Sequence, residues 1–199
     1  MKNSYNILIF GASYGSLLAT KLILAGHTVK LVCLPAEAEL ITKVGTRVRL
    51  PIIGREKLVE IDSSQLPGML SAATPDSVNT SDYDLIALAM QEPQYRSPEV
   101  YKLLNEIADK NKPCLSIMNM PPLSYLIRIP NLDIDYLKQC YTDHTVWDRF
   151  DPKLITLASP DPQAFRPPEE GLNVLQVGLP TNFKVARFDS DEHNKILIQ

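Results

Sequence analysis

The sequence predicts an α/β protein with a mostly parallel main sheet, an antiparallel hairpin insertion and a strand- and loop-rich C-terminal extension. Three observations lead to this prediction. Short apolar runs that suit buried strands alternate with helical patterns. Residues 47–61 alternate polar and apolar side chains around a turn that contains glycine. Beyond Pro130 the regular alternation ends and prolines become frequent.

The chain opens with a strand, a glycine turn and a helix. Residues 5–10 form a short apolar run that ends at Gly11, and residues 16–25 carry apolar side chains at helical spacing. Residues 28–34 form a second run, too short for a buried helix, and Pro35 then stands in the first turn of another helix. This order of elements predicts parallel strands.

The later segments continue the pattern with one interruption. Residues 47–61 indicate an exposed hairpin beside the sheet, and strands are expected at 84–90 and 113–118 with an amphipathic helix at 99–108 between them. We therefore place one domain over residues 1–130 and an extension over residues 131–199.

The extension carries two strand candidates, residues 172–177 and 182–188. Residues 189–192 are typical of a helix cap with an acidic first turn, and the sequence ends soon afterwards. We expect the extension to lead into a missing helical domain of a longer protein. Alternatively, a homodimer completes the fold.

Composition excludes several classes of protein. A net charge of -3 leaves no basic surface for nucleic acid. No apolar run reaches the roughly 18 residues that a membrane span needs, and no signal peptide precedes the first strand, so we expect a cytoplasmic protein. Three widely spaced cysteines and three scattered histidines favour reduced thiols and no metal site.

The glycine turn predicts a phosphate site. At the carboxyl edge of a doubly wound, Rossmann-type sheet, the helix after the first strand directs its free N–H groups at the ligand. Gly11 would make the tight turn and Gly15 would let helix and strand pack closely, although Ser13 replaces the usual second glycine in a loop one residue shorter. The cofactor-binding candidates here are Gly11, Ala12, Ser13, Tyr14, Gly15 and Ser16.

Two other interpretations of this turn stay open. The glycines could serve strand-to-helix packing alone. The same letters also fit G-x-S-x-G, in which Ser13 would be the nucleophile of a serine hydrolase with His144 or His193 as its base. Against this, only ten residues precede Gly11, whereas a hydrolase elbow follows several strands.

The segment after the second strand leaves NAD and NADP undecided. An acidic residue about 20 residues past the glycines would bind the ribose hydroxyls of NAD, and an arginine would bind the 2′-phosphate of NADP. Residues 32–35 hold neither, so Glu37 or Glu39 would have to reach back from the following helix.

The stretch NILIFGASYGSLLATKLILAGHTVKLV resembles the opening of the ketopantoate reductase family, and residues 5–127 follow its order of segments. The resemblance implies an NAD(P)-dependent oxidoreductase, or its cofactor-binding part, acting on a small carbonyl, hydroxy or amino-acid-type substrate. It makes Asn119, at the end of a strand, a catalytic candidate. Opine dehydrogenases share this general plan.

Two departures from the family keep a non-catalytic binding or oligomerisation module as the alternative. The family's lysine after the fourth parallel strand is replaced by Ala89-Met90-Gln91-Glu92, and no lysine or glutamate of a C-terminal helical domain can be carried over. Met90 and Gln91 remain cofactor-binding candidates at this edge.

Other side chains could take part in chemistry. Gln91, Glu92, Gln94 and Tyr95 could line the cleft, or form a solvated loop. His144, in the densest ionisable cluster, could donate a proton, although a surface loop histidine is the simpler interpretation.

Overall fold

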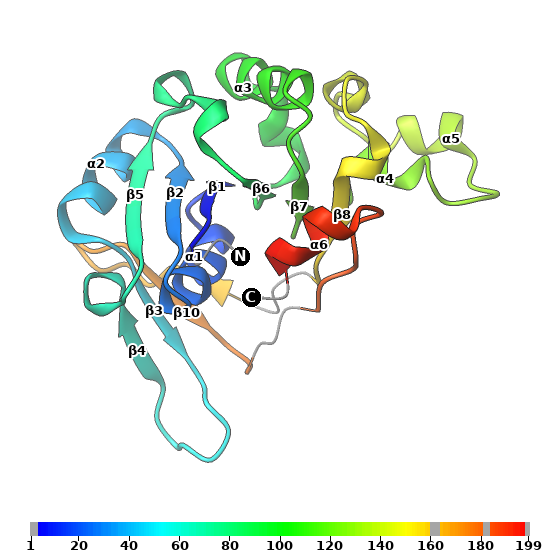
Figure 1. Ribbon diagram of the computed structural model, residues 1–199. Coiled ribbons are helices and arrows are strands. Elements are labelled where there is room, and N and C mark those ends of the chain that lie inside the picture. Colours follow the sequence, from blue (N-terminus) through cyan, green and yellow to red (C-terminus); the bar gives the residue numbers. More distant parts are fainter. Residues whose placement is uncertain (1–3, 160–163, 181–183, 198–199) are drawn as a thin grey trace.

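The computed structural model describes residues 4–159, 164–180 and 184–197 (Figure 1). Its main sheet has six strands in the order β5-β2-β1-β6-β7-β8, and every neighbouring pair is parallel. This is the strand order of a doubly wound dinucleotide-binding sheet, so the predicted Rossmann-type fold is confirmed. The strands are β1 Asn6–Phe10, β2 Thr28–Val32, β5 Met69–Ala73, β6 Leu85–Leu88, β7 Cys114–Ser116 and β8 Ile155–Leu157.

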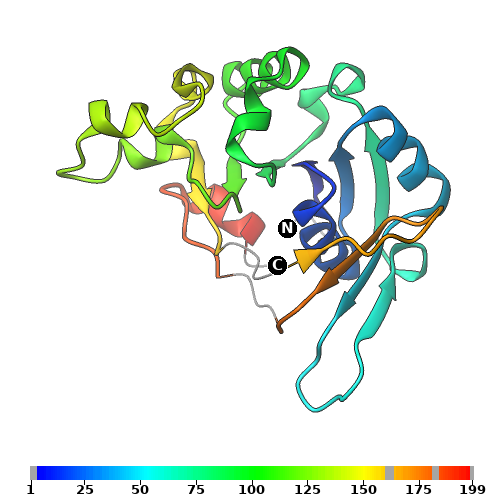
Figure 2. The ribbon, with the colours of Figure 1, turned by 180° about the vertical axis from the view of Figure 1, so that it is seen from behind.

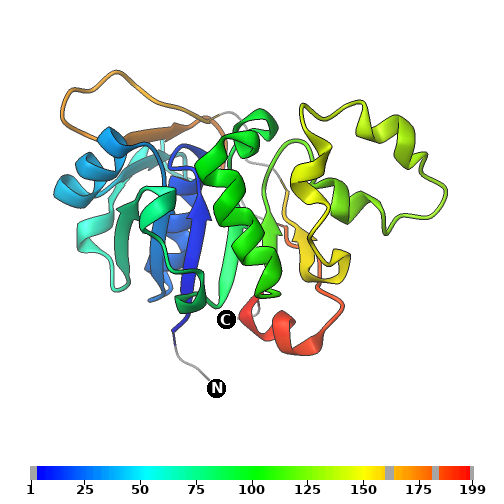
Figure 3. The ribbon, with the colours of Figure 1, turned by 90° about the horizontal axis from the view of Figure 1, so that it is seen from above.

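Helices cover both faces of the main sheet. α1 Tyr14–Leu24, α2 Pro35–Val44 and α6 Asp191–Leu197 pack on one face, and α3 Pro98–Asp109 and α4 Leu123–Leu126 pack on the other. Figure 3 shows α3 lying over the strands of the sheet, with the short α5 Ile134–Lys138 at the outer end. The short 3-10 helices are η1 Ser63–Gln65, η2 Pro75–Ser77, η3 Thr80–Asp82, η4 Glu92–Arg96, η5 His144–Trp147 and η6 Pro152–Leu154.

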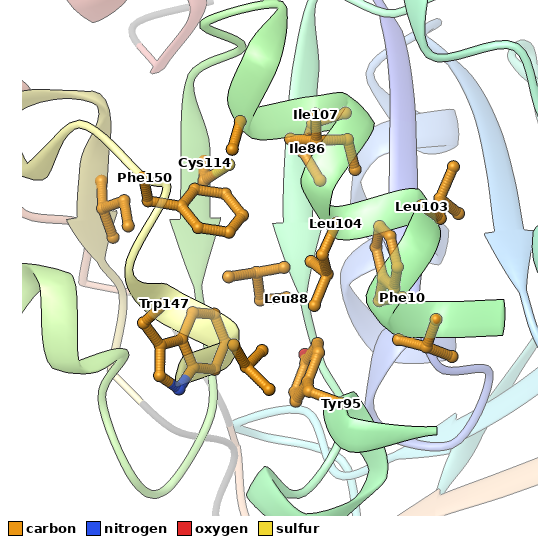
Figure 4. Packing of buried hydrophobic residues seen from close by; sticks show 14 of the residues in the cluster. Phe10, Ile86, Leu88, Tyr95, Leu103, Leu104, Ile107, Cys114, Trp147 and Phe150 are labelled. Atoms are coloured by element: carbon orange, nitrogen blue, oxygen red, sulfur yellow. The ribbon is translucent and has the colours of Figure 1, made fainter. Parts of the chain in front are cut away.

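Burial on both faces explains why the central strands β1 and β6 are almost entirely apolar. In β1, Leu8 and Phe10 join the core under α3, whereas Ile7 and Ile9 join the core under α1. The α3 side also receives aromatic residues from the extension, as Figure 4 shows. There the ring centroids of Trp147 and Tyr95 lie 5.3 Å apart.

A second sheet, in the order β4-β3-β10-β9, packs against the outer side of α1. The predicted hairpin is confirmed, because β3 Arg47–Leu50 and β4 Val59–Asp62 pair antiparallel, and their turn projects from the body in Figure 2. From the extension, β10 Val174–Val177 pairs parallel with β3, and β9 Ala164–Phe165 pairs with β10. Leu17 of α1 contacts this sheet, so α1 is buried between two sheets.

The prediction of a strand at residues 182–188 is wrong for residues 184–188, the part that the structure describes. Residues 182 and 183 lie outside the described residues, and within 184–188 only Val185 forms a bridge, to Ala158. The ladder ends there because the side-chain amide of Asn194 bonds both the N–H and the carbonyl of Phe188 and turns the chain into α6.

β5 and β8 were not predicted from the sequence, and α1 begins two residues before its predicted start. β8 shows that the extension supplies a strand to the main sheet. The division at residue 130 stays a prediction. No helix within the described ranges is both long and apolar enough to cross a membrane.

Candidate functional site

The carboxyl edge of the main sheet has a topological switch point between β1 and β6. These two strands are neighbours, and the helices that follow them, α1 and α3, pack on opposite faces of the sheet. The loops after the two strands therefore part and leave a crevice, which is where doubly wound folds bind their ligands.

A cleft of about 1010 Å³, the larger cleft, occupies this crevice. It runs from the turn after β1 to the ends of β2 and β5 on one side and to the loop after β6 on the other. It is lined by residues 11–14, 32–35, Glu37, 74–76, 89–91, Gln94, Ser97, Glu99, Val100 and Arg166. Four of the glycine-turn candidates and both Met90 and Gln91 thus lie on one cleft.

The two glycines of the turn have different surroundings. Gly11 adopts a φ of +97°, and a Cβ there would lie 3.0 Å from Met90 Cγ and 3.1 Å from the Ala89 carbonyl oxygen. A Cβ on Gly15 would lie 2.8 Å from Ile9 Cγ2. Gly11 therefore shapes the turn between the two strand ends, and Gly15 lets α1 approach β1, as the sequence predicted.

The start of α1 has unpaired donors. The N–H of Ser16 bonds the Ser13 carbonyl oxygen, and its hydroxyl bonds the Ala12 carbonyl oxygen. The N–H groups of Ser13, Tyr14 and Gly15 have no acceptor among the described residues. Such donors at a helix N-terminus suit a phosphate group, so this turn fits the pyrophosphate of a dinucleotide.

The same turn lacks the partners of a serine nucleophile. Ser13 is exposed and lines the larger cleft, but no described histidine lines that cleft. His193 packs against Phe188, and Nδ1 of His144 lies 4.0 Å from a carboxylate oxygen of Asp148. Burial, with the charge of Glu37 adding to it, raises the pKa of Cys33 to about 12, so this thiol stays protonated.

A second cavity of about 480 Å³, the smaller cavity, adjoins the larger cleft. The two share a wall made of Tyr14, Ala89, Met90 and Gln91. The rest of the smaller cavity is lined by Glu92, Pro93, residues 117–120, Cys140 and Thr142. Asn119 is therefore placed beside the larger cleft, with its side chain exposed and without a hydrogen bond to another described residue.

Hydrogen bonds fix the outer wall of the smaller cavity. The carboxylate of Glu92 accepts from the N–H and the hydroxyl of Thr142, at 3.1 and 2.7 Å. The hydroxyl of Tyr141 donates to the Pro121 carbonyl oxygen at 2.5 Å, and burial raises the pKa of Tyr141 to about 12. No lysine, arginine or histidine is among the described residues that line this cavity.

Not every side chain that could line the cleft does so. Gln91 and Gln94 line the larger cleft and Glu92 the smaller cavity, but Tyr95 is fully buried, and its hydroxyl accepts from the Met90 N–H at 3.1 Å. Tyr95 supports the shared wall from behind. His144 lines neither cavity. In the described part of the chain, metal-binding side chains form no group of three.

Several residues that line the larger cleft were not predicted from the sequence. Thr74 to Asp76 follow β5, a strand that was not expected, and Arg166 lies beside Glu37 although it is far from it in the sequence. The frequent prolines of this segment gave no sign of the contact.

Solved structures share this fold. A probable 2-dehydropantoate 2-reductase from Bacillus subtilis matches 96% of this chain and 53% of its own, with a TM-score of 0.60 and 20% identity. A candidate ketopantoate reductase from Ralstonia solanacearum MolK2 matches 96% of this chain and 56% of its own, with a TM-score of 0.61 and 16% identity. The chain spans about half the length of these structures. The resemblance found in the sequence is confirmed for the fold. No protein-family model and no curated protein matches the sequence.

Proposed function

We propose that this chain is the cofactor-binding part of an NAD(P)-dependent oxidoreductase of the ketopantoate reductase type. It would act on a small carbonyl, hydroxy or amino-acid-type substrate. The observation that carries the proposal is the pair of adjoining cavities at the switch point, of which the larger meets the unpaired amides of α1. One cavity suits a dinucleotide, and the other suits a small molecule beside it.

In this proposal, the position of each residue along the two cavities determines which part of the cofactor or substrate it would contact. The amides of residues 13–15 would hold the pyrophosphate, and the ends of β2 and β5 would enclose the adenosine. Met90 and Gln91 would face the nicotinamide, which when bound supplies or accepts a hydride. Asn119, on the smaller cavity, would hold the polar group of the substrate through its side-chain amide.

Calorimetric titration with NADH and NADPH tests this proposal. We expect at least one of them to bind with heat and to raise the melting temperature. Ser13→Gly should preserve or improve binding, because it restores the glycine usually found there and removes a Cβ from the cleft. If millimolar concentrations of both dinucleotides leave heat and melting temperature unchanged, the proposal is wrong.

A second candidate function is a non-catalytic Rossmann-type module. The observation that favours it is that, among the described residues, no cationic side chain lines the smaller cavity, so no proton donor of the lysine type faces a substrate there. Assays with keto acids, alcohols and amines in the presence of the bound dinucleotide separate the two. Turnover by this chain alone would exclude the non-catalytic module.

The hydrolase alternative has its own test in the same variant. If Ser13 were a nucleophile, Ser13→Gly would abolish ester hydrolysis and leave dinucleotide affinity unchanged. We expect no esterase activity that depends on Ser13, since no described histidine lines its cleft.

A further inference from the structure

Glu37 stands where a Rossmann fold recognises the adenosine ribose. It lies in the first turn of α2, 22 residues after Gly15, and it lines the larger cleft beyond the end of β2. Its side chain is 21% exposed, so the carboxylate is held in place but still reaches the cleft. An acid at this point accepts hydrogen bonds from the ribose hydroxyls of NAD.

The carboxylate of Glu37 is held by an arginine from the other end of the chain. Nη1 of Arg166 forms an ion pair with Oε1 of Glu37. Arg166 belongs to a segment, residues 164–171, that we call the arm; it runs from β9 toward β10 and passes beside α2 in Figure 3. Glu169 of the arm forms a two-point ion pair with Arg49 of β3, in which Nη2 and Oε2 lie 3.0 Å apart. The second sheet thereby anchors the arm that carries Arg166.

The charges around this end of the cleft favour a ribose without a phosphate. The described residues that line the larger cleft include three carboxylates, Glu37, Asp76 and Glu99, and one guanidinium, Arg166. A 2′-phosphate that met the remaining N–H donors of Arg166 would lie beside the carboxylate of Glu37, and one guanidinium would then face two anionic groups. A ribose diol brings no charge, and a carboxylate that accepts from arginine still has free lone pairs for hydroxyl donors.

We propose that Glu37, positioned by Arg166 of the arm, makes this site selective for NAD(H) over NADP(H). This inference rests on the proposed function, since it requires that a dinucleotide binds in the larger cleft. It assigns the arm a role in the adenosine end of the site: the second sheet positions Arg166, Arg166 positions Glu37, and Glu37 binds the ribose hydroxyls.

Calorimetric titration of the unaltered chain with NADH and NADPH is the first test. We expect NADH to bind about 10-fold more tightly or better, and ADP-ribose to exceed 2′-phospho-ADP-ribose by a similar factor. Equal affinities, or tighter binding of the phosphorylated ligands, would overturn the inference and leave the proposed function standing. If neither dinucleotide binds, both are wrong.

Two charge variants locate the selectivity. In Glu37→Gln, Arg166 loses its partner and can meet a 2′-phosphate, so the preference for NADH should fall to about 1 or invert. Glu39→Gln is the matched control, because Glu39 is exposed on the same helix and does not line the cleft. In Glu39→Gln, the ratio of the dissociation constants for NADPH and NADH should equal that of the unaltered chain. If this ratio is also unchanged in Glu37→Gln, the assignment of selectivity to Glu37 is wrong.

Arg166→Ala separates a positioning role from a phosphate-binding role. We expect weaker NADH binding by a few-fold, since Glu37 loses its anchor, and NADPH binding that is no better than before. Selective loss of NADPH binding with NADH unaffected would show that Arg166 binds the phosphate, and would overturn the inference. Thermal unfolding of each variant checks that it is folded.

Discussion

The two cavities at the carboxyl edge of the sheet are built in different ways. The larger cleft is formed mainly by the ends of parallel strands and by the start of α1, so its shape follows from the topology of the sheet. The smaller cavity takes its outer wall from a 3-10 turn and from the extension, where Glu92 bonds Thr142. The topology of the sheet therefore defines the larger cleft, where we propose that the cofactor binds, whereas the smaller cavity depends on hydrogen bonds between side chains of separate loops.

Gly15→Ala should have the largest effect on the cofactor side. The added Cβ would lie 2.8 Å from Ile9 Cγ2 and 3.4 Å from Leu31 Cδ2, so α1 must move away from the sheet. We expect the free energy of unfolding to fall by about 1 to 3 kcal/mol and dinucleotide binding to weaken by a similar amount. Urea unfolding and calorimetry measure the two.

Ser13→Ala is the control in the same turn, because Ser13 is exposed and its side chain has no partner among the described residues. Its stability should stay close to that of the unaltered chain. A Gly15→Ala protein of unchanged stability would mean that α1 does not depend on the close approach to β1.

Tyr95→Phe tests the shared wall. Without the hydroxyl, the Met90 N–H loses its acceptor at 3.1 Å, while the ring still fills the core. We expect a loss of about 1 kcal/mol in the free energy of unfolding and weaker binding in both cavities. Tyr141→Phe makes the same chemical change on the far side of the smaller cavity, where the hydroxyl bonds Pro121. We expect Tyr141→Phe to leave dinucleotide affinity unchanged. If it weakens dinucleotide binding as much as Tyr95→Phe does, the outer wall of the smaller cavity also affects the larger cleft.

Thr142→Val should have a smaller effect, confined to the substrate side. It removes the hydroxyl that donates to Glu92 at 2.7 Å and keeps the shape of the side chain. Because this bond is exposed, we expect a change below about 1 kcal/mol in the free energy of unfolding, with unchanged dinucleotide affinity. A marked fall in calorimetric affinity for the dinucleotide would show that the outer wall also serves the cofactor.

The smallest effect is expected at the amino edge of the sheet, remote from both cavities. His27 is buried, its Nδ1 accepts from the Tyr5 N–H at 3.3 Å, and burial lowers its pKa in the folded protein. The unfolded chain therefore takes up the proton first, so stability should fall as the pH drops through about 6.5 and level off below the folded pKa.

In His27→Asn, whose amide oxygen can replace Nδ1 as acceptor, this part of the acid dependence should disappear. Urea unfolding of both proteins between pH 8 and pH 5 measures the difference. If the free energy of unfolding depends on pH in the same way in both proteins, His27 does not cause this part of the acid dependence.

Elements with a local signal in the sequence could be predicted, whereas contacts between segments far apart in the sequence could not. β1, the glycine turn and α1 could be predicted because apolar period and glycine position are local signals. β5 was missed because Met69 to Ala73 consists mostly of small, partly exposed residues that resemble a loop. From the sequence, Tyr95 could line the cleft or belong to a solvated loop, but the turn that begins at Glu92 directs its ring into the core. The pair of Glu37 and Arg166 could not be predicted, since no local pattern shows that the extension returns to α2.

We propose that the larger cleft holds a dinucleotide on the free amides of α1. Amide chemical shifts of the labelled chain, followed during titration with NADH, test it most directly. We expect the largest changes at residues 11–15 and at Met90 and Gln91, with small changes at the amino edge around His27. Saturable binding whose shifts spare residues 11–15, or no shift at millimolar NADH and NADPH, would contradict it.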